Sequence, residues 1–105
     1  MTNYHVLREF GDGITQEQLD EAVDRSNKAT ESMREDGHAI AYIGSDVFAD
    51  GDGNIRATIC SYDAESEDDV REQSTRGELP LSGIFLRGTA VDAEAPRAGV
   101  GQKAT

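Results

Sequence analysis

Three side chains in this sequence are good ligands for a transition metal: His5, His38 and Cys60. Imidazole and thiolate groups bind borderline metals such as nickel, copper and zinc. The alternative is that both histidines are half-exposed residues at strand ends and that Cys60 is a small packed hydrophobe, which is how free cysteines usually behave. A shared metal site therefore depends on the elements that position these three residues.

A second group of side chains, Tyr42, Arg56 and Tyr62, could line a pocket for a small aromatic or carboxylate compound. Such a pocket would suit a small-molecule binding module or a cofactor-free enzyme of the monooxygenase or isomerase kind, because these sites place polar groups in a sheltered apolar cavity. The alternative is that the tyrosines only pack in an interface, while Arg56 reaches solvent over its own stem.

Motifs that would mark a known class of enzyme are missing from the sequence. There is no Ser-His-Asp order, no phosphate-binding glycine motif, and no CxxC or HExxH, so hydrolase, nucleotide-binding, thioredoxin-like and zinc-protease functions have no support. Asp50, Asp52 and Asn54 mimic the start of a calcium-binding loop, but Ile55 and Ser61 replace the required glycine and glutamate. We expect a protein that is not an enzyme, with a solvated hairpin at this loop.

The hydrophobic pattern predicts six secondary-structure elements. Alternating residues indicate strands at 4–10, 38–48, 55–62 and 84–87. Thr15 followed by Gln18 is a capping box, which predicts a helix from there to Gly37. Ser66 caps a second, shorter helix that ends near Arg76. The resulting order is β-α-β-β-α-β.

This order is typical of the ferredoxin-like α+β sandwich, an antiparallel sheet with two helices on one face. We expect this domain to span residues 1–89, followed by a flexible tail at 90–105. In that topology the first and second strands run parallel with the third between them. Strand spacing would then bring His5, His38 and Cys60 to one edge of the sheet, with the histidine backbones about 10 Å apart.

Two helices can cover only one face of such a sheet. The other face is predicted to carry an apolar patch formed by Tyr42, Phe48, Cys60 and Tyr62, which a monomer of this size would rarely leave in water. We therefore expect a homodimer that closes sheet against sheet, with any ligand site in or beside the interface.

The charge balance limits the partners of the chain. There are 21 acidic and 10 basic residues, a net charge of -11, which argues against nucleic acid or an anionic membrane as a partner. The beginning of the sequence lacks the features of a signal peptide, and no apolar run approaches the roughly 18 residues of a membrane helix. These features, with a single cysteine, predict a cytoplasmic protein.

Four phrases of the sequence resemble a known family. They are YHVLREF-GDGITQEQL, GHAIAYIGSDVF, CSYDAESEDDVRE and RGELPLSGIF. Together they are similar to a family of small ferredoxin-like proteins of unknown function that includes a bacterial nickel-binding protein, over roughly residues 4 to 88. The resemblance implies the same fold, a dimer and a nickel site, with His5 as the residue that matches as a ligand.

The spread of acidic residues leads to a prediction about salt. Because they run from Glu9 to Glu94 rather than forming one tail, the composition suggests adaptation to high salt. At molar ionic strength the Debye length is only about 3 Å, which screens the repulsion between these carboxylates. The midpoint of thermal unfolding should therefore rise steeply between low and molar KCl, as measured by circular dichroism. A flat response would contradict the halophilic interpretation.

Overall fold

Four strands and two helices follow one another along the chain in the predicted order. The computed structural model describes residues 1–91 and 93. The elements are β1 (Thr2–Ile14), α1 (Gln16–Glu35), β2 (Ile40–Ala49), β3 (Ile55–Ala64), α2 (Glu67–Arg76) and β4 (Gly83–Leu86). The predicted strands and helices all exist, although β1 is longer than expected at both ends. The predicted flexible tail at 90–105 lies mostly outside the described residues.

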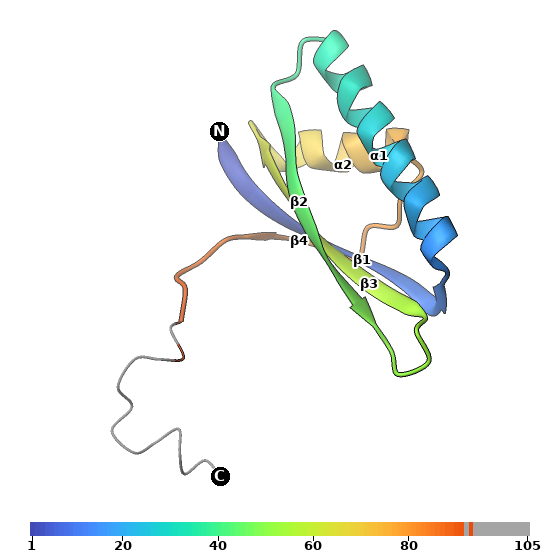
Figure 1. The fold of residues 1–105 in the computed structure, drawn as a ribbon. Helices are drawn as coiled ribbons and strands as arrows, with labels where there is room; N and C mark the ends of the chain where they lie inside the picture. The colour runs from blue at the N-terminus through green and yellow to red at the C-terminus, as the bar shows by residue number, and fades with distance from the viewer. Residues whose placement is uncertain (92, 94–105) are drawn as a thin grey trace.

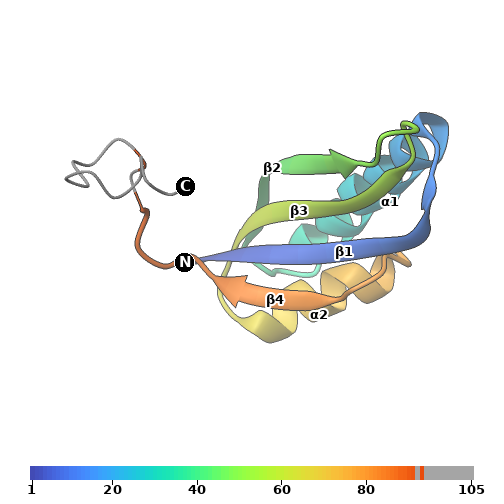
Figure 2. The ribbon, with the colours of Figure 1, turned by 90° about the horizontal axis from the view of Figure 1, so that it is seen from below.

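The strands form one antiparallel sheet in the order β2-β3-β1-β4. β1 and β2 therefore run parallel with β3 between them, as the sequence predicted. Figure 2 shows this order from the uncovered face, with both helices behind the sheet. Figure 1 shows α1 and α2 together on the same side. The arrangement confirms a ferredoxin-like α+β fold.

Both helices begin at the residues that the sequence indicated. Thr15 accepts a hydrogen bond from the backbone N–H of Gln18, and the Gln18 side chain accepts one from the backbone N–H of Thr15. Ser66 accepts a hydrogen bond from the backbone N–H of Asp69. Each cap satisfies N–H groups that the first turn of a helix leaves unpaired. Neither described helix is long and apolar enough to cross a membrane.

The space between sheet and helices contains a polar cluster as well as apolar side chains. Tyr62 and Gln73 are fully buried, and Arg8 is only 2% exposed. The Tyr62 hydroxyl lies 2.8 Å from Ser26 Oγ on α1. Gln73 Nε2 on α2 donates to Ser26 Oγ at 3.0 Å, and its Oε1 accepts from Arg8. This cluster connects two strands to both helices.

A bulge in β2 decides which side chains face the helices. Tyr42 pairs with Tyr62, but the next pair is Gly44 with Ser61, so Ile43 is an extra residue. An extra residue reverses the alternation of side chains beyond it. Tyr42 therefore faces the helices, whereas Phe48 lies on the uncovered face, although the unbroken alternation of the sequence places them together.

The predicted apolar patch on the uncovered face is wrong in three of its four residues. Tyr62 is fully buried beneath the helices and Cys60 is 7% exposed on the same side. Tyr42 joins them, with its ring centroid 5.3 Å from that of Tyr62. Only Phe48 remains. A different apolar set lies on the uncovered face: Leu7, Ile43, Ile59 and Phe85.

The buried cluster predicts a marked effect of one hydroxyl group on stability. Tyr62→Phe removes a hydroxyl that contacts Ser26, Arg8 and Gln73. Leaving buried polar partners unsatisfied typically costs about 1–3 kcal/mol. The free energy of unfolding, measured with urea, should fall by that amount.

Tyr4→Phe is the matched control. Tyr4 is also buried, but its hydroxyl makes no hydrogen bond with the residues that the structure describes. This variant should change the free energy of unfolding by less than about 0.5 kcal/mol. Equal effects of the two substitutions would show that the buried cluster does not stabilise the fold.

Candidate functional site

His5 lies on the uncovered face, on the inner strand β1. It pairs with Ser61 on β3 and with Phe85 on β4. Together with Ile43, Asp46 and other residues of β2 and β3, it lines a shallow groove on this face. Its Nε2 atom is buried and has no hydrogen-bond partner among the described residues. A buried nitrogen without a partner is costly in a finished structure, so it is a candidate position for a ligand.

Cys60 and His38 lie away from His5. Cys60 pairs with Val6, the residue after His5, so the two side chains point to opposite faces of the sheet. His38 precedes β2, and its Nδ1 lies 3.1 Å from Asp69 Oδ1 at the start of α2. The three residues lie toward the same end of the sheet, but their side chains do not converge within a single chain.

Within the described part of the chain, no group of three or more His, Cys, Asp or Glu side chains could hold a metal ion. Metal binding by His5 stays a prediction.

The predicted pocket around Tyr42, Arg56 and Tyr62 does not form on the uncovered face. The two tyrosines lie on the helix side of the sheet. Arg56 is exposed near the hairpin end, where its Nε donates to the carbonyl oxygen of Gly11 at 2.9 Å. No cavity found among the described residues is lined by all three side chains, because Arg56 lies near the hairpin end of β3, away from the two tyrosines.

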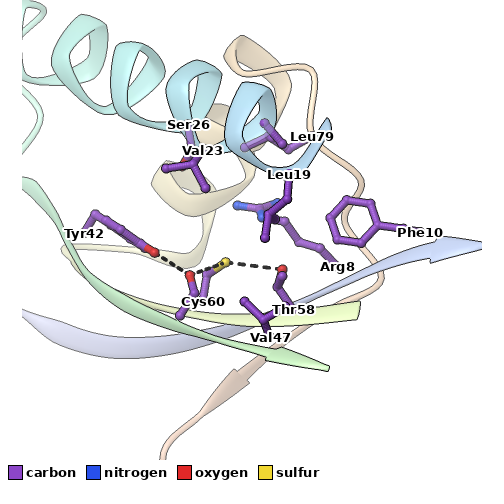
Figure 3. Close-up of a pocket in the computed structure, with 12 residues that line it drawn as sticks. Arg8, Phe10, Leu19, Val23, Ser26, Tyr42, Val47, Thr58, Cys60 and Leu79 are labelled. Carbon is purple, nitrogen blue, oxygen red and sulfur yellow. Dashed lines mark hydrogen bonds between the residues drawn. The ribbon is translucent and has the colours of Figure 1, made fainter. Parts of the chain in front are cut away.

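Tyr42 instead lines a cavity between the sheet and α1 (Figure 3). Its hydroxyl contacts Ser45 Oγ, which donates to Cys60 Sγ at 3.0 Å. Cys60 Sγ also lies 3.6 Å from Thr58 Oγ1. Burial raises the pKa of the Tyr42 phenol above its usual value. The chain of hydroxyl and thiol groups along the floor of the cavity is therefore neutral at its tyrosine end.

The loop that resembles a calcium site has a structural role. The Asp50 carboxylate accepts hydrogen bonds from the backbone N–H groups of Asp52 and Asn54 at 2.9 and 3.0 Å. The hydrogen bond from Asn54 is the main reason that the pKa of Asp50 lies below its usual value. The carboxylate thus closes the hairpin loop, as expected for a loop without the glycine and glutamate of a calcium site.

The burial of Arg8 could not be predicted from the sequence. It alternates with Tyr4 and Val6 toward the helices, while the opposite parity of β1 carries Glu9. Each face of this strand thus carries one charged residue, so the alternation alone did not show which face was buried. A polar signal was present on α2, where Gln73 and Ser74 follow Val70 at helical spacing on the buried face.

Comparison with known proteins gives one match to a family. Residues 4–86 match the family described as nickel responsive protein SCO4226-like. The chain belongs to this family. The match confirms the resemblance seen in the sequence and spans every described strand and helix from Tyr4 to Leu86. No curated protein sequence is significantly similar to this member of the SCO4226-like family.

A solved structure gives the same fold. The crystal structure of SCO4226 from Streptomyces coelicolor A3(2) is similar to this SCO4226-like chain with a TM-score of 0.61 and 16% sequence identity. The similarity covers 85% of this chain and 99% of that chain. At this identity the likeness establishes the fold alone.

Proposed function

We propose that this chain is a homodimeric nickel-binding protein and that His5 is a ligand of the metal. The observation that carries the proposal is the buried, unpartnered Nε2 of His5 on the uncovered face, in the part of the chain that the structure describes. The family to which the chain belongs is described as nickel responsive. Imidazole nitrogen is a suitable ligand for nickel.

Asp46 is the second candidate ligand. It lines the same groove as His5, and carboxylate oxygen completes the mixed nitrogen and oxygen sets that Ni(II) accepts. Such sets need about four donors or more. A second copy of the chain, related by a two-fold axis, would present its own His5 and Asp46 and double the donors.

Apolar exposure on the same face supports the dimer. Ile43, Phe48 and Phe85 are 59%, 49% and 57% exposed, and all three lie on the face that no helix covers. Leu7 and Ile59 lie beside them, half-buried. Apolar side chains clustered in this way commonly mark an interface. A second copy would cover them because a two-fold interface pairs one patch with itself.

The charges on this face connect the dimer to the metal. The pairing register places Glu9, Asp46 and Asp63 on it. Among the paired residues of the sheet, no lysine or arginine lies on the uncovered face. Two copies would therefore bring carboxylates together, which costs free energy through like-charge repulsion. A divalent cation between them would offset this repulsion, so metal binding should strengthen dimerisation.

Nickel titration tests the role of His5. By calorimetry in molar KCl, the protein without a histidine tag should bind nickel, and His5→Ala should weaken binding at least about 100-fold, since even outer-shell partners of a metal contribute 10–100-fold. His38→Ala is the control and should bind as the unchanged protein does, because His38 pairs with Asp69 away from the groove. No nickel binding, or equal binding by His5→Ala, would refute the proposed site.

Neighbouring residues of β4 provide a test of the dimer interface. Phe85 and Leu86 are 57% and 66% exposed and point to opposite faces of the sheet. Sedimentation in molar KCl should give a dimer for the unchanged protein and for Leu86→Asp, but a monomer for Phe85→Asp. Nickel should shift the equilibrium toward the dimer. A monomer in every case, or a dimer that Phe85→Asp leaves intact, would exclude this interface.

A further inference from the structure

β2 has a free backbone edge. It is the outermost strand in the sheet order β2-β3-β1-β4 and pairs only with β3 among the described strands. Within the part of the chain that the structure describes, no backbone hydrogen bond from a loop or helix reaches residues 44–49. This stretch contains no proline or lysine, the residues that commonly protect such an edge. Its outer N–H and C=O groups are therefore open to pairing with another extended chain.

The cavity beneath α1 opens beside this free edge. Figure 3 shows Leu19 and Val23 of α1 above the cavity and Val47 of β2 below it. Val23 and Val47 are 40% and 47% exposed, so the mouth lies between α1 and β2. A side chain that enters there contacts aliphatic carbon atoms from the helix and from the strand, which favours an apolar group.

The polar groups on the floor of the cavity bond to one another. The Tyr42 hydroxyl contacts Ser45 Oγ, which donates to Cys60 Sγ at 3.0 Å, and Cys60 Sγ lies 3.6 Å from Thr58 Oγ1. An occupant therefore needs no polar group inside the cavity. A water-sized group takes about 10–15 Å³, so the volume of about 50 Å³ suits the isopropyl group of a valine but not an aromatic ring.

A strand added to β2 would place such a side chain at the mouth. Adjacent strands lie about 4.8 Å apart, and residues directly opposite one another share a face of the sheet. Val47 points toward the helices, so the residue opposite it on an added strand would also point beneath Val23. Main-chain hydrogen bonds together with a pocket for an alternate side chain are the means by which edge strands recognise extended peptides.

Carboxylates near the mouth indicate the charge of such a peptide. Asp20 lies one turn before Val23 on α1, and with Glu17 and Glu21 it lines a depression on the same helix. Among the described residues, none of these three carboxylates forms an ion pair. The whole chain carries a net charge of -11. Complementary charge therefore favours a peptide with lysine or arginine over an acidic one.

We propose that β2 and α1 bind an extended basic segment of a partner protein, which pairs with residues 44–49 and inserts one small aliphatic side chain into the cavity. The free edge supplies the main-chain bonds, and the cavity selects the side chain. This site uses the outer edge of β2 and the helix side of the sheet, whereas His5 lies on the uncovered face. The proposal therefore does not rest on the proposed nickel site.

A synthetic peptide tests the proposal on the unchanged protein. The probe is a seven-residue threonine peptide with a central valine and a lysine at each end, and amide NMR follows its titration. Saturable shifts should appear at Val23 and Val47. Replacing the valine by glycine should weaken binding about tenfold or more, the factor expected for burying a valine side chain. Replacing both lysines by glutamate should also weaken it.

Methylation of the peptide nitrogen atoms distinguishes strand pairing from apolar contact alone. A paired strand donates the N–H groups of alternate residues to its neighbour. Methyl groups on one alternate set of nitrogen atoms should therefore abolish binding, whereas methyl groups on the other set should leave it unchanged. Equal binding of the two methylated peptides, or no saturable shift with the unmethylated one, would overturn the proposal.

Two variants then locate the site. Ala22→Leu fills the cavity from α1 and should weaken binding as much as loss of the peptide's valine does. Thr75→Leu adds the same side chain at an exposed position of α2 and should leave binding unchanged. A folded Ala22→Leu that binds the peptide as the unchanged protein does would exclude this cavity.

A second copy of the chain is the competing occupant of the free edge. In that case sedimentation would show a self-association that Val47→Asp disrupts and Phe85→Asp does not, because Phe85 lies on the uncovered face. This outcome would overturn the proposal of a partner peptide.

Discussion

The buried charge of Arg8 is the constraint around which the domain is arranged. It lies between the sheet and both helices, and its Nη1 and Nη2 atoms donate to groups from β3, α2 and the segment before β4. Tyr62 and Gln73 then continue the cluster to Ser26 on α1. Because each buried polar group needs a partner, these elements can pack in few other ways. A small acidic chain with a modest apolar core thus obtains a defined arrangement from polar contacts.

The bulge at Ile43 divides the residues of β2 between two environments. Before it, the alternation places Ile40 and Tyr42 beneath the helices; beyond it, Ser45 and Val47 take that side while Asp46 and Phe48 face outward. The same bulge therefore completes the floor of the cavity and brings a carboxylate into the groove of His5. One extra residue in an edge strand thereby shapes both faces of the sheet.

The two faces have different chemistry. In the part of the chain that the structure describes, the uncovered face combines the His5 imidazole with carboxylates and exposed apolar side chains. The covered face combines a buried arginine, its neutral hydrogen-bond partners and apolar side chains. The middle of β1 contributes to both, since His5 and Arg8 point to opposite sides of the strand. The sheet thus separates two environments of different polarity.

The helix caps at Thr15 and Ser66, the order of the elements and the ferredoxin-like topology were all predictable from the sequence, because caps and periodicity depend on residues close together in the chain. His5 could also be picked out as a candidate ligand from its residue type. The parity of β1 and the bulge at Ile43 were not predictable. They depend on which side chains find partners across the sheet, and only the packed structure buries Arg8 with Tyr62 and moves Cys60 away from His5.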